Sequence, residues 1–129
     1  MNYEVKINDF IKDFEVPELR KKIGWGPREY EYPKLFERCN FHASIRNDEG
    51  VLIGFGYICG MGLEHGYMED IMIDPNYQKK GLGTKLVKKL LEEAKRQNIL
   101  IISVTLDPEN ENFYKNCGFD IGLSGTVIY

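Results

Sequence analysis

The seven residues from Gln78 to Thr84 read Gln-Lys-Lys-Gly-Leu-Gly-Thr, a composition typical of a phosphate-binding loop. Gly81 and Gly83 allow the backbone to turn tightly and to approach a ligand closely. An amphipathic helix is expected directly after the loop, and the first amides of such a helix lack partners and carry about half a positive charge. Three lysines add positive potential: Lys79, Lys80 and Lys85. The segment predicts a pyrophosphate site; a glycine-softened turn with solvated lysines is the alternative.

Two common phosphate motifs do not fit this loop. A P-loop requires a glycine five positions before Gly83 and a lysine directly after it, but those positions hold Gln78 and Thr84. A dinucleotide fingerprint requires a third glycine at the position of Leu86. If the loop binds a phosphate, it does so as another class of site.

Hydrophobic periodicity places the loop between a strand over residues 67–73 and a helix over residues 83–98. Further strands are expected at residues 3–7, 41–45, 51–59, 99–106, 119–121 and 126–129. Further helices are expected at residues 16–23, 32–39 and 109–116. The order β-α-α-β-β-β-α-β-α-β-β predicts a mixed α/β fold with about six to seven strands and about four helices.

Three segments in this order resemble motifs of the GCN5-related N-acetyltransferase (GNAT) superfamily. Gln78-x-x-Gly81-x-Gly83, five residues after the strand end at Ile73, resembles the family's coenzyme-A loop. The segment Glu-Asp-Ile-Met-Ile-Asp-Pro at residues 69–75 is similar to the fourth strand and its exit, and residues 112–119 are similar to the late helix. The resemblance covers nearly the whole chain, and the layout resembles short bacterial and plastid-type members. It implies a single GNAT domain over residues 1–129 with a twisted, mixed and mostly antiparallel sheet.

The resemblance also implies where coenzyme A would bind. The amides of the loop would hold the pyrophosphate, and the residues concerned are Gln78, Lys79, Lys80, Gly81, Leu82, Gly83 and Thr84. The backbone of Ile71 and Ile73, with Met72 between them, would pair with the pantetheine arm like an added strand. Asn112, or Asn110 before it, would contact the thioester end, and Tyr114 would lie beside the sulfur.

Acetyl transfer from a thioester to a free amine needs no metal and no protein nucleophile, but it needs proton donors and acceptors. We expect Tyr114 to protonate the leaving thiolate, with packing in the core as its alternative role. A strand amide such as that of Ile71 would stabilise the oxyanion. Free alkyl ammonium groups have a pKa of about 10.4, so a carboxylate or a water must remove a proton.

Glu69 is the candidate base, and Asp70 is its rival or a substrate-binding carboxylate. Side chains alternate across a strand, so only one of the two is expected to face the acetyl site. Family members with Glu-Asp before this strand favour the glutamate. Solvated charges at a strand end, or a proton path through water alone, are the alternatives.

Aromatic residues before the first hairpin are candidates for the acceptor wall, because the family forms that wall from its first two helices. Trp25, Tyr30 and Tyr32 would suit an aromatic amine or an alkylammonium held by cation–π contacts. Ordinary packing is the alternative.

Composition narrows the function classes. The chain of 129 residues has a net charge of −3 and a pI near 5.4, which argues against a nucleic-acid partner. Its three cysteines have no metal-ligand spacing and predict free thiols in a reducing cytoplasm, without a metal. No signal peptide or membrane-length apolar run is seen, so we expect a soluble cytoplasmic protein. A monomer or a homodimer is expected, with the apolar residues 126–129 as a dimer seam.

The sequence therefore predicts an acyltransferase that uses acetyl-CoA to acetylate a primary amine in a ternary complex. The alternative is a catalytically silent coenzyme-A-binding regulator of the same fold, and an unrelated phosphate-binding module is a third hypothesis. The acceptor can be a small molecule or a protein amine, and the short segment before the first hairpin favours a small one.

Overall fold

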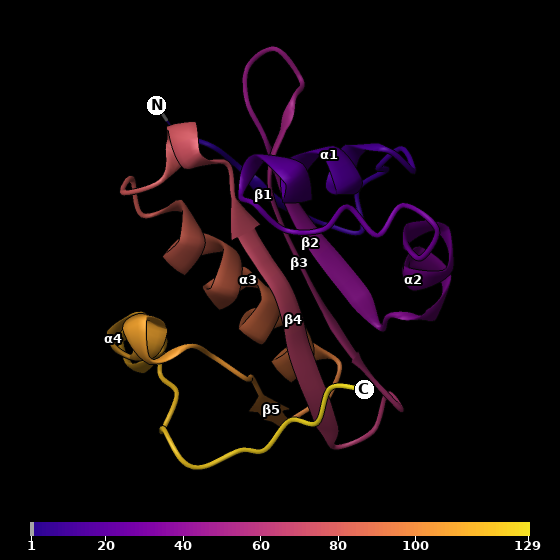
Figure 1. Cartoon of the computed structure of the whole chain (residues 1–129). Helices are drawn as coiled ribbons and strands as arrows, with labels where there is room; N and C mark the ends of the chain where they lie inside the picture. The colour runs from indigo at the N-terminus through magenta and orange to yellow at the C-terminus, as the bar shows by residue number, and fades with distance from the viewer. Residues whose placement is uncertain (1) are drawn as a thin grey trace.

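The computed structural model describes residues 2–129 and contains one five-stranded sheet (Figure 1). Its strands are β1 (Val5–Ile7), β2 (Phe41–Arg46), β3 (Leu52–Gly60), β4 (His65–Ile73) and β5 (Ile101–Ser103). They lie in chain order across the sheet; neighbours are antiparallel, except that β4 and β5 are parallel. The predicted mixed, mostly antiparallel sheet is confirmed. A parallel pair needs a crossover connection, and a helix fills the one between β4 and β5.

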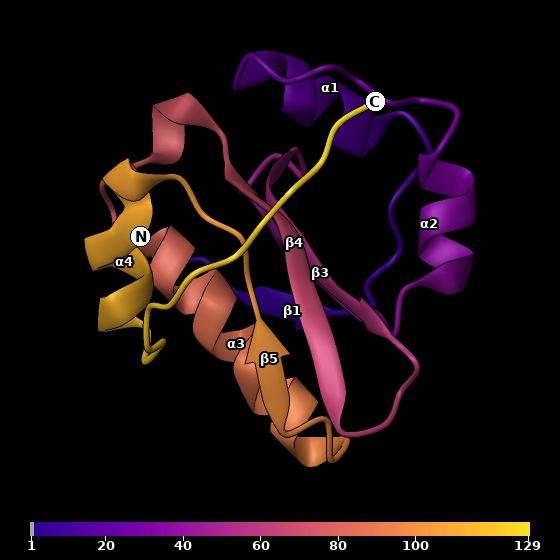
Figure 2. The same ribbon diagram turned by 60° about the horizontal axis from the view of Figure 1, so that its bottom comes forward.

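Helices cover both faces of the sheet (Figure 2). The helices α1 (Glu15–Lys22) and α2 (Tyr32–Arg38) lie on one side, and α3 (Leu82–Arg96) and α4 (Glu111–Asn116) lie on the other. Short 3₁₀ turns at Pro75–Tyr77 and Pro108–Asn110 precede α3 and α4. The seven predicted elements from residue 3 to residue 98 all form, with ends within about two residues of those expected.

Each face of the sheet has its own apolar core. On one face, Phe55, Tyr57 and Met72 of the sheet pack against α1 and α2, and Leu19 of α1 is buried in this core. On the opposite face, α3 presents a buried stripe to the sheet, made by Leu82, Leu86, Val87, Leu90 and Ala94. The stripe follows the helical period that the sequence showed, so the burial of α3 explains its position across the sheet.

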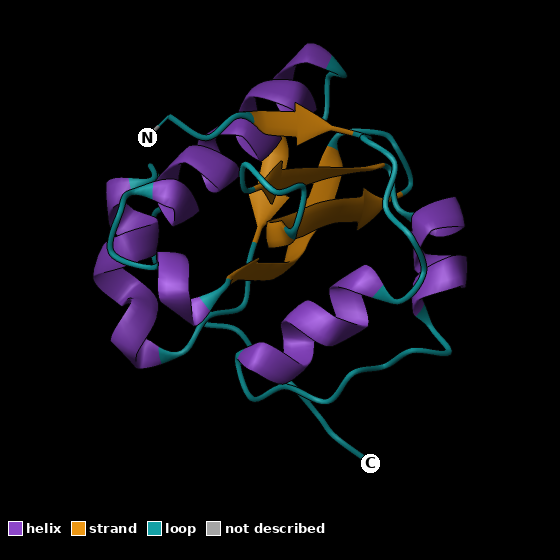
Figure 3. Cartoon of the chain, turned by 90° about the horizontal axis from the view of Figure 1, so that it is seen from above, coloured by secondary structure: helices purple, strands orange, loops and turns teal. Residues whose placement is uncertain are grey.

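The predicted strands at residues 119–121 and 126–129 do not form, so the expectation of six to seven strands is wrong. Residues 122–129 are exposed; residues 122–124 line a groove beside β5, and the end of the chain extends away from the body of the molecule (Figure 3). Their apolar, β-branched composition favours a strand, but a strand also needs a neighbouring strand to pair with. The element order ends with α4.

The predicted buried strand at residues 99–106 is also shorter than expected. Only Ile101–Ser103 form β5, and Ile101 is 48% exposed at the edge of the sheet. Ile99 alone in this run is fully buried. The continuous apolar run predicts a buried strand, whereas β5 lies at the edge of the sheet and has β4 as its neighbour.

The described part of the chain, residues 2–129, has no helix with the length and apolar character required to cross a bilayer.

Gly66 provides a test of how tightly β4 and β5 pack. A Cβ atom at this position would lie 2.9 Å from Ile58 Cγ2, 2.9 Å from Ile99 Cγ2 and 3.3 Å from Ile102 Cδ1. Because the first two are buried β-branched side chains with little freedom to move, Gly66→Ala should lower the free energy of unfolding by about 1–3 kcal/mol. Urea denaturation followed by circular dichroism measures this change. Gly125→Ala, where the added atom meets nothing within 4 Å, is the control; equal stability of the two variants would contradict the packing described.

Candidate functional site

The predicted phosphate loop joins β4 to α3 and has the backbone geometry that its glycines suggest. Gly81 has φ of 79° and directly precedes the first helical residue, Leu82. This left-handed conformation favours glycine because it has no Cβ. Asp74 fixes the start of the loop: its backbone N–H donates to the Ile53 carbonyl at 2.8 Å, and its side chain accepts from the Asn76 N–H at 2.9 Å.

The amides at the start of α3 are available to an anion. The Lys85 N–H donates to the Gly81 carbonyl, and within residues 2–129 no backbone acceptor is found for the amides of Leu82, Gly83 and Thr84. A Cβ atom on Gly81 would meet nothing within 4 Å, so the space in front of this helix end is open. Unpaired amides, the positive helix end and open space together fit a phosphate group.

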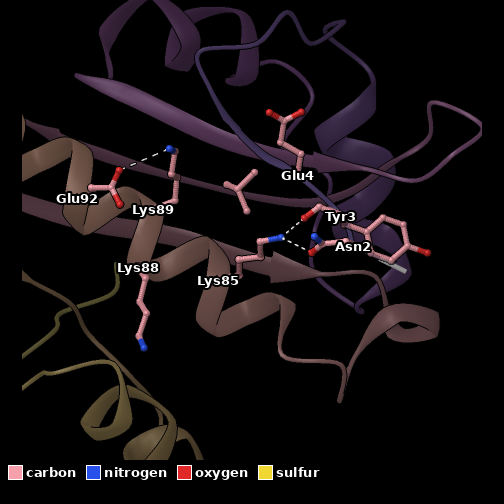
Figure 4. Close-up of a pocket in the computed structure, with 8 residues that line it drawn as sticks. Asn2, Tyr3, Glu4, Lys85, Lys88, Lys89 and Glu92 are labelled. Carbon is pink, nitrogen blue, oxygen red and sulfur yellow. Dashed lines mark hydrogen bonds and ion pairs between the residues drawn. The ribbon is translucent and has the colours of Figure 1, made fainter.

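Lys85 does not lie at this loop, contrary to the expectation from sequence. It points to the N-terminal segment, where its Nζ donates to the Tyr3 carbonyl and to Asn2 Oδ1 (Figure 4). These residues line a groove of about 450 Å³ between the N-terminal segment and α3, which contains none of the predicted site residues. Lys80 Nζ lies 5.7 Å from the centre of the Tyr77 ring, and Lys79 lines the cavity described next.

A cavity of about 460 Å³ begins at the phosphate loop and runs along β4. Its wall is formed by β4, the loop, the start of α3 and α4, through Ile71, Met72, Ile73, Gln78, Lys79, Gly83, Asn110, Phe113 and Tyr114. β5 pairs only with His65–Tyr67 at the start of β4, so residues 71–73 have no strand partner on that side. The separation of the two strands leaves an open sheet edge beside an open cavity.

Gln78 has a local role that sequence reasoning did not foresee. Its side-chain amide donates to the Ile73 carbonyl at 3.0 Å and thereby closes the last turn of the loop against β4. The side chain is therefore engaged within the protein, although Gln78 does line the cavity.

Asn110 and Tyr114 reach the inner end of this cavity, whereas Asn112 does not. Asn112 is exposed and lines neither this cavity nor the smaller one described below. Tyr114 is 8% exposed and packs edge-to-face against Phe113 and Phe119. Burial, with smaller contributions from Cys117 and Tyr67, raises the pKa of Tyr114 to about 12. The phenol therefore keeps its proton throughout the neutral pH range.

A second, smaller cavity of about 180 Å³ adjoins the first and shares Ile71, Asn110 and Tyr114 with it. Glu69 and Asp70 both line it, so the expectation that only one of them would face the acetyl site is wrong. Strand alternation fails here because the β3–β4 register shifts between Phe55 and Tyr57. Asp70 has φ of 55°, which marks a β-bulge at this point.

The two carboxylates have different surroundings. Asp70 Oδ2 accepts a hydrogen bond from Tyr32 Oη, lies 2.9 Å from Arg20 Nη1 and lies 3.7 Å from Arg28 Nη1. Glu69 accepts one hydrogen bond, from Tyr57 Oη at 2.7 Å, and forms no ion pair within residues 2–129. Asp70 is thus compensated by two guanidinium groups, and Glu69 is the carboxylate free to accept a proton.

The candidate aromatic residues of the acceptor wall separate into three kinds. Trp25 is 41% exposed, lines the smaller cavity and has the Arg20 guanidinium 5.2 Å from its ring centre. Tyr32 is fully buried, and burial together with the charge of Asp70 raises its pKa. Tyr30 is 87% exposed and lies outside both cavities. Only Trp25 of the three can contact an acceptor in the smaller cavity.

Sequence reasoning missed four residues that shape this site: Arg20, Arg28, Tyr57 and Asp107. Arg20 donates from Nε to the Gly26 carbonyl at 2.5 Å and so also fixes the loop that carries Trp25. A signal for it existed, because Arg20 interrupts the apolar stripe of α1. Asp107 lines the smaller cavity, and its position just after the predicted strand at residues 99–106 was a second signal.

No group of three or more metal-binding side chains is found within residues 2–129. Cys39, Cys59 and Cys117 are free thiols, and burial raises the pKa of each.

Removing the charge of Asp70 should destabilise the protein. Asp70→Asn leaves the largely buried Arg20 without its counter-charge, so the free energy of unfolding should fall by about 3–5 kcal/mol. Glu18→Gln is the control, because it breaks the exposed Lys21–Glu18 pair and should cost less than ~0.5 kcal/mol. Chemical denaturation of both variants provides the comparison, and a loss below ~1 kcal/mol for Asp70→Asn would show that the pair is not structural.

Comparison with known proteins agrees with this architecture. The acetyltransferase (GNAT) family model matches residues 7–119. The uncharacterized N-acetyltransferase ycf52 of Gracilaria tenuistipitata var. liui is 27% identical over 123 residues, covering 92% of this chain and 68% of that protein. The chain spans 56% to 68% of the length of the relatives that it matches over 90% or more of its own length.

Solved structures share the fold. A probable acetyltransferase from meticillin-resistant Staphylococcus aureus superposes with a TM-score of 0.84 at 22% identity, covering 98% of this chain and 99% of that one. The GNAT family N-acetyltransferase YhbS of Escherichia coli, in complex with CoA, gives a TM-score of 0.75 at 20% identity, covering 92% of this chain and 68% of that one. With a family model that matches most of its length and this fold, the chain belongs to the GNAT acetyltransferase family.

Proposed function

We propose that this chain transfers the acetyl group of acetyl-CoA to a primary amine by direct attack in a ternary complex. One observation carries the proposal: two cavities meet at Ile71, Asn110 and Tyr114, one leading to an anion-binding loop and the other lined by free carboxylates. A thioester entering by the first cavity and an amine entering by the second would meet at these three residues.

The larger cavity suits coenzyme A in its shape and donor groups. The amides of Leu82, Gly83 and Thr84 would bind the pyrophosphate, with Lys79 and Lys80 adding positive charge. The edge of β4 at residues 71–73 has no strand partner and would take the amide groups of the pantetheine arm in the manner of strand addition, except at the Ile73 carbonyl, which accepts from Gln78. Asn110, which lines this cavity, would contact the thioester end, and the exposed Asn112 would not.

Proton transfer in the proposed reaction divides between two residues. Glu69, directly or through a water, would take one proton from the bound ammonium, and the neutral nitrogen would then attack the thioester carbonyl carbon. The N–H of Ile71 would donate to the oxyanion of the tetrahedral intermediate. The carbon–sulfur bond would then break, the second proton that the nitrogen loses would pass to the thiolate, and Tyr114 would donate a hydrogen bond to that sulfur.

The raised pKa of Tyr114 refines its role. The pKa of the phenol is about 12 and that of a free thiol is about 8.5, so complete transfer of the proton to the thiolate is unfavourable by about 3.5 pKa units. Tyr114 therefore acts chiefly by donating a hydrogen bond to the departing sulfur, and the same high pKa prevents it from acting as the base.

The proposed activity is tested by thiol release from acetyl-CoA over a panel of primary amines, with coenzyme affinity measured in parallel by calorimetry. Turnover with at least one amine is the expected result. Tight coenzyme binding without turnover of any amine would instead indicate the silent regulator.

Assembly as a monomer or homodimer, a cytoplasmic location and the absence of a nucleic-acid partner stay predictions.

A bulky residue at position 81 should weaken coenzyme binding. Gly81→Val forces a β-branched side chain into a left-handed conformation and into the open space before α3, so the KM for acetyl-CoA should rise ~10–100-fold, as expected for the loss of charge-assisted hydrogen bonds. Gly50→Val is a matched control: Gly50 also has positive φ and open surroundings, but it lies in the β2–β3 hairpin. An unchanged KM for the Gly81 variant would remove the loop from the binding site.

Loss of the Tyr114 hydroxyl should slow the chemical step. Tyr114→Phe keeps the ring packing, so kcat should fall ~10–100-fold while the coenzyme Kd stays the same. Tyr129→Phe, in the exposed C-terminal segment, is the control for tyrosine loss. Steady-state kinetics and calorimetry separate the two effects, and a variant with wild-type kcat would show that this hydroxyl does not assist departure of the thiolate.

A further inference from the structure

The smaller cavity has an uneven charge lining that bears on the acceptor. Three carboxylates line it, those of Glu69, Asp70 and Asp107, and no lysine or arginine does. Arg20 and Arg28 compensate the charge of Asp70 through ion pairs. The cavity therefore presents two uncompensated negative charges, on Glu69 and Asp107.

Asp107 has no structural task that would explain its charge. Its side chain makes no capping hydrogen bond to the 3₁₀ turn that follows, and it forms no ion pair with any residue from 2 to 129. The residue is exposed, yet it lines the same cavity as Glu69, and it lies in the segment after β5. An unpaired carboxylate on a cavity wall favours a cation inside that cavity.

The reacting nitrogen can use only one of the two carboxylates. Under the proposed function, that nitrogen gives its proton to Glu69 and must be neutral when it attacks. Asp107 is then left to bind a second positive charge on the same molecule. The half-exposed ring of Trp25, which has the Arg20 guanidinium 5.2 Å from its centre, adds an apolar surface for the methylene groups.

We propose that the acceptor is a small aliphatic amine with a second cationic group, of the diamine or polyamine class, and that Asp107 binds that second group. The inference rests on the proposed function. The same lining discriminates against amines that carry a phosphate or a carboxylate, because specificity follows from repulsion of the wrong substrate as well as attraction of the right one.

Matched amines test the inference by thiol release at saturating acetyl-CoA. The probes are 1,4-diaminobutane, 1-aminopentane, in which a methyl replaces the distal amine, and the anionic amine glucosamine 6-phosphate. The kcat/KM of the diamine should exceed that of the monoamine by ~10-fold or more, the size expected for one charge-assisted contact. Glucosamine 6-phosphate should be the poorest acceptor of the three.

Asp107→Asn should raise the KM of the diamine and so reduce the preference for it to ~3-fold or less, because a neutral hydrogen bond replaces a charged one. The kcat/KM of the monoamine should stay the same. Glu109→Gln, an exposed carboxylate two residues away that lines neither cavity, should keep the wild-type preference. Calorimetry with coenzyme A shows that each variant is folded.

The outcomes are distinguishable. Turnover of amines without a diamine preference, or a preference that survives Asp107→Asn, overturns the inference and leaves the proposed function standing. Coenzyme binding without turnover of any amine overturns both.

Discussion

The site depends on one largely buried interaction, that of Asp70 with Arg20, Arg28 and Tyr32. It joins segments separated by 50 and 38 residues in the chain, in addition to apolar packing and the ion pair of Lys22 with Asp74. Because the side chains of Asp70 and Arg20 are each only 9% exposed, neither charge can be left alone without a large desolvation cost. The interaction therefore fixes α1 and α2 against the bulge in β4.

The bulge in turn sets what the site can do. A regular strand would direct Glu69 and Asp70 to opposite faces, whereas the irregular backbone at Asp70 brings both to one cavity. One carboxylate is then used as a structural anchor and the other is left free. The second requirement is the separation of β5 from β4 beyond Tyr67, which exposes the backbone of residues 71–73 and gives the larger cavity its length.

The sequence allowed the central elements to be predicted, because their signals are local. The two glycines of the loop and the apolar stripe of α3 specify their own conformation, and the loop geometry at Gly81 follows directly. The bulge could not be predicted, since it arises from the register between β3 and β4 and not from the residues of β4 alone. The same reason explains the missed partners of Asp70. Residues 126–129 show the opposite error: their propensity favours a strand, but propensity does not supply a partner.

Gly83 has a further consequence through its contact with Phe113. A Cβ atom at position 83 would lie 3.2 Å and 3.3 Å from two atoms of the Phe113 ring, so the first turn of α3 and the helix that carries Tyr114 touch with almost no clearance. Positions 83 and 113 are thus expected to constrain each other: an alanine at 83 would require the Phe113 ring to shift by a few tenths of an ångström. If the turn at Gly83 binds a ligand as proposed, any shift of that turn on binding would reach Tyr114 through the same contact.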